Sequence, residues 1–434
     1  MGTDANERAG WYALLHHPLA GVGLLSAATV AALVWANSPW GALHEALFST
    51  PLRVGLGDLE LEKPLLLWVN DGLMGIFFFL VGLEIKRELL AGELNGLRQA
   101  ALPAIAAVGG MVVPAGLYLL VQAGGPGARG WGVPMATDIA FALGALAVLG
   151  RRVPAALKVF LTAVAIVDDI GAVLVIAVAY TDTIVLVSLL AGLALFAVAI
   201  AANRFDVRSP VLYFLLGTAV WLAFLQSGVH ATVAALLMAL TIPARTRIDG
   251  EGLVREVRAH LARLHEVGLP SDTRLNTPAQ QGVLTAVGET LERSEAPLQR
   301  LEHALHPVVT FGVLPLFALA NAGVRLDGDP TEVVTDPIAI GIVVGLVVGK
   351  PIGIGGFARA AVALGLADLP EGVRWRHVFG AGALAGIGFT MALFIGSLAF
   401  DDPGAVVTAK LAIVGASVLS AAVGASLLAR APQR

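Results

Sequence analysis

The chain has 434 residues, of which 57% are hydrophobic and only 14% charged, and its formal net charge is −4. Because about a quarter of the residues of a soluble protein are charged, this composition excludes a soluble globular protein and predicts an all-α polytopic membrane protein. The sequence contains no cysteine, which excludes a disulfide framework, a thiolate nucleophile and a cysteine-bound metal centre.

Twelve apolar segments are long enough to cross a bilayer. In chain order they lie at approximately 17–37, 65–85, 101–121, 131–149, 153–180, 184–202, 209–225, 228–243, 305–323, 337–358, 377–400 and 404–429. Arg8 precedes the first apolar run, but no small-residue cleavage site occurs before Trp35, so we expect a retained span rather than a signal peptide. We therefore expect one integral membrane unit over residues 1–434, with about twelve transmembrane helices.

Basic residues divide unequally between the two sides of this topology. If the N-terminus lies inside, four of the 28 Lys and Arg residues fall on the outer side, two lie within spans and the remaining 22 lie on the inner side. Since Lys and Arg are enriched in cytoplasmic loops, both termini are expected in the cytoplasm.

Two segments between the spans have patterns of their own. Residues 52–64 alternate leucine with other residues around a Gly-Asp pair, which predicts an external β-hairpin. An isolated hairpin is unstable and has unpaired strand edges, so we expect it to pair with its copy in a homodimer. Residues 244–304 mix Arg, Glu and Leu at helical spacing, which indicates a long, partly helical and solvated cytoplasmic loop.

Four charged residues stand out within the apolar spans, namely Asp138, Asp168, Asp169 and Lys350. An ionised group at the centre of a span costs about 3 kcal/mol. A purely structural salt bridge explains the set poorly, because burying an ion pair is usually no better than burying apolar residues. Adjacent Asp168 and Asp169 point about 100° apart on a helix. One can face a cation while the other faces a cavity, where it can carry a proton or bind a small hard cation.

Two of the spans carry helix breakers just before a polar residue. The fourth span contains Pro134, and the eleventh contains Gly386 and Gly388. Interrupted spans at corresponding positions of two halves are typical of transporters built from inverted repeats, with the ion site at the midplane. We therefore expect repeats at approximately 101–180 and 337–429, with two discontinuous helices that cross at the midplane.

Discontinuous helices leave partial charges at their ends, positive at the N-termini and negative at the C-termini. Asp138 and Lys350 are expected to compensate these partial charges. Thr137, the neighbour of Asp138, offers a neutral oxygen to an ion.

Eight segments of the sequence resemble the bacterial sodium/proton antiporter family NhaA. They are FFFLVGLEIKREL (77–89), ATDIAFALG (136–144), AIVDDIGA (165–172), SGVHAT (227–232), RLEHALHP (300–307), LFALANAG (316–323), GKPIGI (349–354) and GIGFTMALFIGSLAF (386–400). The resemblance covers nearly the whole chain. It implies an electrogenic, pH-dependent antiporter of the bacterial inner membrane, which exports Na⁺ or Li⁺ in exchange for H⁺ and so regulates internal pH and sodium. It implies no cofactor and no nucleic-acid partner.

The resemblance also assigns roles to the charged residues of the spans. Asp169 is similar to the family's main cation ligand and proton carrier. Asp168 is similar to its partner, which pairs with Lys350 when the site is empty. Thr137 and Asp138 match the crossing of two extended chains.

A second group of residues matches positions that the family ties to its pH response. The positions at the cytoplasmic mouth are Glu84, Arg87, Glu88, Glu302, His303 and His306, and His230 matches a further position. A capping or packing role is the alternative for the histidines. Asp71 is interpreted either as the cap of the second span or as part of an acidic outer funnel. The 244–304 loop is longer than the family's usual connection, so the pH profile is the property least well predicted.

Other function classes fit the charged residues less well. An intramembrane aspartyl protease needs two carboxyls that face one water from different helices, whereas Asp168 and Asp169 are adjacent. A transporter of an organic solute usually reads its larger ligand with aromatic or Arg side chains, which do not cluster here. A channel is disfavoured because no repeated filter motif is present. The sequence therefore predicts a secondary active transporter rather than an enzyme.

Overall fold

The computed structural model describes residues 19–56, 59–181, 183–268, 277–326 and 330–430. Among the basic residues counted on the inner side, Arg8, Arg274 and Arg434 lie outside these ranges, as do the start of the predicted first span and the tip of the predicted β-hairpin.

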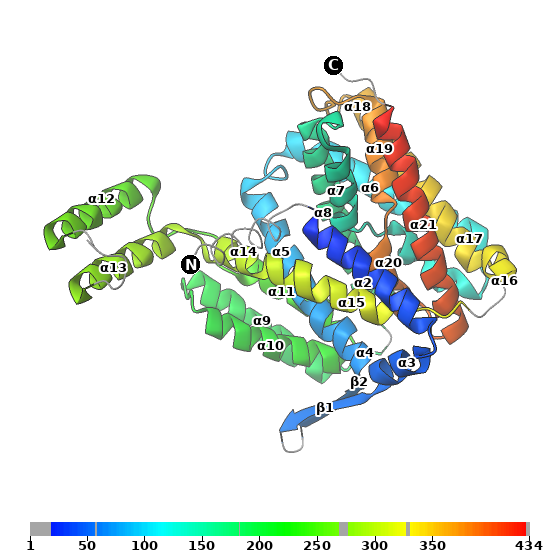
Figure 1. Cartoon of the computed structure of the whole chain (residues 1–434), viewed down its shortest axis with the longest axis horizontal. Helices are drawn as coiled ribbons and strands as arrows, with labels where there is room; N and C mark the ends of the chain where they lie inside the picture. The colour runs from blue at the N-terminus through cyan, green and yellow to red at the C-terminus, as the bar shows by residue number, and fades with distance from the viewer. Residues whose placement is uncertain (1–18, 57–58, 182, 269–276, 327–329, 431–434) are drawn as a thin grey trace, which may run out of the picture.

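The described chain is a bundle of apolar helices with one β-hairpin (Figure 1). The helices without a central break that lie at the predicted spans are α2 (Ala20–Ala36), α5 (Met74–Ala91), α6 (Leu97–Gln122), α8 (Ala155–Ala179), α9 (Leu186–Arg204), α10 (Pro210–Ser227), α11 (Ala231–Thr241), α14 and α15 (Pro297–Val308 and Leu314–Asn321), α17 and α18 (Pro337–Val344 and Lys350–Ala363), and α21 (Pro403–Ala429). Among them α11 is a shorter apolar helix, and α2 is long enough only together with the bent helix that follows it. Eight helices of the described ranges are long and apolar enough to cross a bilayer. The protein is therefore an integral membrane protein, and each predicted span coincides with a helix or a helix pair.

Two spans are broken near their middle. A 3₁₀ segment, Pro126–Met135, meets α7 (Ile139–Leu149) at 44°, and α19 (Trp375–Ala385) meets α20 (Phe389–Ala399) at 48°. The extended links touch each other, since the backbone N–H of Asp138 donates to the carbonyl oxygen of Ile387 at 2.7 Å. The predicted crossing of two discontinuous helices is thus confirmed. The limits of the two predicted repeats stay a prediction.

Three further spans contain a π-helical turn. These turns are Trp68–Leu73, which joins α4 (Leu65–Leu67) to α5, Val309–Val313 between α14 and α15, and Gly345–Gly349 between α17 and α18. Single π-turns inside α-helices are common at functional sites. The third turn leads directly into Lys350. Farther along, α18 packs on α6 at close range, because a Cβ at Gly353 would collide with the backbone of Gly109.

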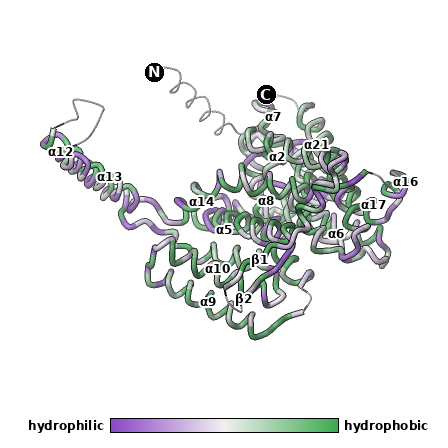
Figure 2. Tube along the Cα trace, turned by 60° about the horizontal axis from the view of Figure 1, so that its bottom comes forward, coloured by the Kyte–Doolittle hydropathy of each residue, from purple (hydrophilic) through white to green (hydrophobic). Residues whose placement is uncertain are grey.

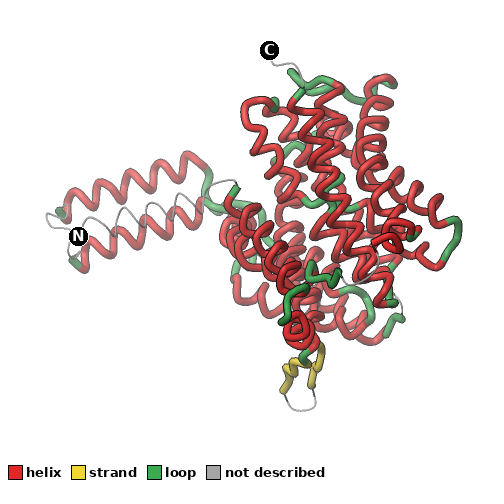
Figure 3. Tube along the Cα trace, turned by 45° about the vertical axis from the view of Figure 1, so that its right-hand side comes forward, coloured by secondary structure: helices red, strands yellow, loops and turns green. Residues whose placement is uncertain are grey.

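The β-hairpin lies at one end of the bundle, and the C-terminal end of α21 lies at the other (Figure 3). Strands β1 (Pro51–Leu56) and β2 (Leu59–Pro64) pair antiparallel, with Leu52 opposite Lys63. Arg53 and Glu62 form an ion pair across the strands at 2.9 Å. The hairpin prediction is confirmed. We call this end of the molecule the β-hairpin end. At this end a short helix, α3 (Gly41–Ser49), turns by 109° from α2.

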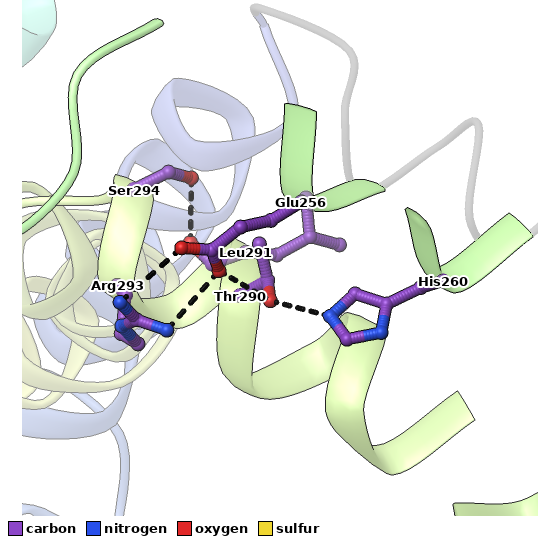
Figure 4. Close-up of polar contacts among 6 residues, drawn as sticks. All are labelled: Glu256, His260, Thr290, Leu291, Arg293 and Ser294. Carbon is purple, nitrogen blue, oxygen red and sulfur yellow. Dashed lines mark hydrogen bonds and ion pairs between the residues drawn. The ribbon is translucent and has the colours of Figure 1, made fainter. Parts of the chain in front are cut away.

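A helical hairpin projects from the side of the bundle, to the left in Figure 1. It consists of α12 (Gly250–Val267) and α13 (Pro278–Ser294), which carry more hydrophilic residues than the bundle (Figure 2). Figure 4 shows the polar contacts between the two helices. Glu256 accepts hydrogen bonds from Thr290 at 3.2 Å and from Arg293 at 3.1 Å, and the ring of His260 contacts the Thr290 hydroxyl at 3.1 Å.

The predicted end of the 244–304 loop is wrong. The span that follows it begins at Pro297 rather than at residue 305. Pro297 occupies the first helical turn, where its missing N–H costs nothing, and the apolar pattern alone did not reveal this polar first part of the helix. Glu302 and His303 therefore lie on α14 and not in the loop.

Candidate functional site

The Asp138 carboxylate holds the N-terminal ends of both half-helices that leave the crossing. Its Oδ1 accepts a hydrogen bond from the backbone N–H of Phe141 in α7 at 3.1 Å. Its Oδ2 accepts from the backbone N–H of Thr390 at 3.0 Å and from the Thr390 hydroxyl at 2.5 Å, both in α20. One negative charge thus compensates two positive helix ends. Sequence reasoning missed Thr390 as a partner, because no local pattern signals a contact between residues that are 252 positions apart.

Lys350 forms a buried ion pair with Asp168. Its Nζ also donates to the hydroxyl of Thr137 at 2.9 Å. Thr137 Oγ1 lies 2.6 Å from Asp168 Oδ2 and 2.9 Å from the carbonyl oxygen of Ala385, so its single proton has two acceptors available. In the described ranges, the hydrogen bonds of Lys350 thus go to Asp168 and Thr137, and it is Thr137 that reaches a carbonyl at the C-terminal end of α19. The role of Lys350 in compensating the partial charge of a half-helix end stays a prediction.

Asp169 has no partner for either carboxylate oxygen among the described residues, and the Oδ1 of Asp168 has none either. Each of the two residues is 1% exposed. A buried carboxylate without a hydrogen-bond partner is costly, and such groups in folded proteins usually have a functional explanation. In the part of the chain that is described, no three His, Asp or Glu side chains gather as a metal cluster. The free oxygens suit a small monovalent cation or a proton.

A cavity of about 220 Å³ connects Asp169 with the molecular surface, whereas Asp168 is not part of its wall. Its inner end is formed by Asp169, Thr137 and Asp138, and its other polar lining residues include Glu84, Arg87, Thr162, His306, Thr310 and Thr390. Arg87 lies near the C-terminal end of α5, far from the N-terminal end that follows β2, and its side chain is 41% exposed. The cavity therefore opens at the end of the bundle opposite the β-hairpin. At about 30 Å³ per water, the volume accommodates several waters and therefore a partly hydrated ion.

An ion-pair cluster lies where the cavity reaches the surface. Arg87 on α5 pairs with Glu302 on α14 at 2.9 Å and with Glu88 at 2.9 Å. His306 is exposed and lines the cavity. His303 is exposed too, but its Nδ1 contacts a backbone carbonyl one turn back on α14 at 2.9 Å, and the residue is not part of the cavity wall. The structure thus brings together five of the six predicted mouth residues, counting Glu84, and leaves His303 beside them.

His230 and Asp71 lie away from this cavity. His230 directly precedes α11, and its Nε2 is 2.7 Å from the carbonyl oxygen of Tyr180 just after α8. Asp71 does not cap the second span, because that helix begins at Leu65. Asp71 lies instead in a π-helical turn and pairs with Lys63 of β2 at 2.8 Å. Its place in an outer funnel stays a prediction.

Comparison with known proteins identifies a family over nearly the whole chain. The family model described as Na⁺/H⁺ antiporter 1 matches residues 13–428. The Na⁺/H⁺ antiporter NhaA of Oleidesulfovibrio alaskensis is 51% identical over 92% of this chain and 88% of the relative. The same-named protein of Koribacter versatilis is 49% identical over 94% and 88%, and Na⁺/H⁺ antiporter NhaA 2 of Syntrophotalea carbinolica is 46% identical over 96% and 95%. The solved structure of the sodium proton antiporter MjNhaP1 from Methanocaldococcus jannaschii aligns over 94% of this chain and 98% of that one, with 14% identity and a TM-score of 0.43.

Proposed function

Since the chain belongs to the Na⁺/H⁺ antiporter 1 family, we propose that it exports Na⁺ or Li⁺ in exchange for protons across the bacterial inner membrane. It is then a secondary active transporter and not an enzyme, and it uses no cofactor and no nucleic acid. Both termini lie in the cytoplasm in this proposal, and the β-hairpin lies outside.

The observation that carries this proposal is the Asp169 carboxylate, which is buried without a partner at the inner end of a cavity. A proton and a cation compete for its oxygens. When the cytoplasm is acidic, Asp169 is protonated and Asp168 stays paired with Lys350, so Na⁺ meets no free carboxylate. When the cytoplasm is alkaline, Asp169 ionises and binds Na⁺, with the free Oδ1 of Asp168 and the hydroxyl of Thr137 as further ligands.

The exchange requires that the site face one side at a time. The cavity reaches Asp169 from the end of the bundle opposite the β-hairpin, and the crossing of the two broken helices lies beside it. A two-state change that closes this route and opens one to the other side completes the cycle. We assign the pH response to the residues at the cytoplasmic mouth, which are Glu84, Arg87, Glu88, Glu302, His303 and His306, and to His230.

The Asp168–Lys350 pair separates this proposal from the protease alternative. A protease would need two carboxylates around one water, whereas Asp168 is paired with Lys350. Asp138, which shares the cavity wall with Asp169, accepts hydrogen bonds from the two half-helix ends.

We expect Na⁺ and Li⁺ to dissipate the pH gradient of everted membrane vesicles that respiration has acidified, and K⁺ to do so weakly. The site offers few oxygens, so it does not replace the hydration shell of a larger cation equally well. Fluorescence of a pH-sensitive dye measures the effect, and vesicles without the protein are the control. Equal effects of K⁺ and Na⁺ would contradict the proposed selectivity. Activity with an organic solute instead of Na⁺ would contradict the proposed cargo.

A second expectation concerns net charge. If bound Na⁺ frees Asp168 from Lys350, two titrating groups act in each cycle and two protons enter for each Na⁺ that leaves. An inside-negative potential should then accelerate Na⁺ efflux from proteoliposomes at zero pH gradient, with the potential set by K⁺ diffusion. Asp169→Asn liposomes measure the leak. A transport rate that ignores the potential would mean one-for-one exchange, and the coupled role of Asp168 and Lys350 would be withdrawn.

A third expectation concerns assembly. The apolar side chains of Leu52 and Val54 in β1 are 45% and 54% exposed, and each strand has one unpaired edge, so the β-hairpin offers a pairing surface for a second copy. Deleting residues 54–63 should give monomers in detergent that still transport Na⁺, as size-exclusion chromatography with light scattering and the vesicle assay can measure. A dimer that persists after the deletion would place the interface elsewhere.

A further inference from the structure

A second cavity, of about 630 Å³, lies at the β-hairpin end of the bundle. It is bounded by α2 and α3, by the residues that follow β2, by the end of α15 and by α21. The ion cycle proposed above does not use it. Three charged residues line it, namely Glu45, Arg325 and Lys410.

Lys410 is the unusual member of this lining. It lies seven residues after Pro403, the first residue of α21, which places its Cα about 10 Å into the membrane at 1.5 Å per residue. The side chain is partly buried and forms no hydrogen bond or ion pair within the described ranges. A lysine at such a depth is costly and usually has a partner or reaches toward the interface. Lys410 therefore lacks an anion.

The carboxylate nearest in the lining does not supply this anion. Glu45 on α3 pairs with Arg325 at 3.5 Å, and their side chains are 74% and 48% exposed. This pair forms a solvent-exposed rim of the cavity, and its two charges cancel. The net charge of the three lining groups is thus positive and comes from Lys410.

The wall between the rim and the bilayer is apolar. Leu67 and Val407 line the cavity, and they are 41% and 40% exposed on the surface of apolar helices. Phe48 and Leu66 line it further inside. The ligand that fits a buried positive charge, a polar rim and an apolar side wall is an anionic amphiphile.

We infer that this cavity binds an anionic phospholipid from the leaflet at the β-hairpin end. The lipid phosphate pairs with Lys410, its headgroup lies at the Glu45–Arg325 rim, and its acyl chains run along Leu67 and Val407. A lipid headgroup and free inorganic phosphate would both offer a phosphate to Lys410. Free phosphate would leave the apolar wall uncovered, so we assign the site to a lipid. This assignment is independent of the proposed transport cycle.

Lys410→Met tests the inference, because methionine keeps the length of the side chain and removes its charge. Native mass spectrometry of the detergent-solubilised full chain should show that the wild type binds phosphatidylglycerol about fivefold or more tightly than the variant, since one lysine near a lipid phosphate contributes about that factor. Phosphatidylglycerol should also raise the melting temperature of the wild type more than that of Lys410→Met. Lys158→Met is the control. It removes an exposed lysine near the N-terminal end of α8 and should behave as the wild type.

Three outcomes would overturn the inference. Equal binding of phosphatidylglycerol to the wild type and to Lys410→Met would remove Lys410 from the site. Equal binding of phosphatidylcholine and phosphatidylglycerol would remove the requirement for a net negative headgroup. Stabilisation by inorganic phosphate as large as that by phosphatidylglycerol would make the ligand a free anion. Lys410→Gln repeats the comparison with a polar side chain should Lys410→Met fail to fold.

Discussion

Asp169→Asn is expected to abolish both Na⁺ binding and transport. The substitution keeps the size of the side chain but removes the charge that attracts the cation and the group that carries the proton. A unit charge pair 4 Å apart at an effective dielectric constant of 20 is worth about 4 kcal/mol, which corresponds to about a thousandfold in Kd. Closer coordination makes the loss larger. Transport in everted vesicles should therefore fall to the background of vesicles without the protein.

The same variant should remain folded, which distinguishes a lost site from a lost structure. Neither oxygen of Asp169 has a partner among the described residues, so replacing the carboxylate removes a costly buried charge. We expect a melting temperature in detergent that equals or exceeds that of the wild type. Na⁺ should raise the melting temperature of the wild type through ligand linkage, but not that of Asp169→Asn.

Proton competition gives this measurement an internal control. Protonation of Asp169 removes the cation ligand, so the Na⁺-induced rise in the melting temperature of the wild type should shrink as pH falls. Glu256→Gln, an acid-to-amide change on the helical hairpin remote from the cavity, should keep the Na⁺ response. Transport by Asp169→Asn at more than background rates would show that another group binds the cation and would remove Asp169 from the centre of the mechanism.

Most of the architecture was predictable because a bilayer imposes simple rules on a chain. A span needs about 20 apolar residues, and backbone breaks at membrane depth occur only where they are buried in protein or line a cavity. Pro134 and the glycines at 386 and 388 therefore predicted the broken helices that the structure contains. The alternating leucines of residues 52–64 likewise predicted the β-hairpin.

The features that sequence reasoning missed depend on contacts across the chain. The three π-helical turns have no periodic signature, since one extra residue in a turn hardly changes an apolar pattern. The bond from Thr390 to Asp138 joins the two halves of the molecule. The partner of Lys350 was inferred from family resemblance, while its contact with Thr137 follows only from the crossing geometry. The charged residues within apolar spans identified the site from the sequence. Their contacts with one another became known only from the structure.

Lys350→Ala is expected to be the most destabilising single change in the charged core. Both members of the Lys350–Asp168 pair are fully buried, with side chains 0% exposed. Removing the lysine leaves Asp168 ionised in an apolar interior with the Thr137 hydroxyl as its remaining donor. Breaking a buried pair on one side costs about 3–5 kcal/mol. The melting temperature in detergent should therefore fall by several degrees, whereas Lys158→Ala at an exposed site should change stability by less than about 0.5 kcal/mol.

The double variant Lys350→Ala with Asp168→Asn separates the loss of a partner from the loss of a side chain. If the cost of Lys350→Ala is the uncompensated charge of Asp168, replacing that charge by an amide should recover much of the lost stability, because removing both members of a buried pair costs far less than removing one. A cavity left by the lysine stem would instead persist in the double variant, and no recovery would follow. A Lys350→Ala protein as heat-stable as the wild type would contradict the ion pair altogether. The recovered double variant would lack the second titrating group of the proposed cycle, so it should exchange one proton for each Na⁺ and should not show the response to membrane potential expected of the wild type.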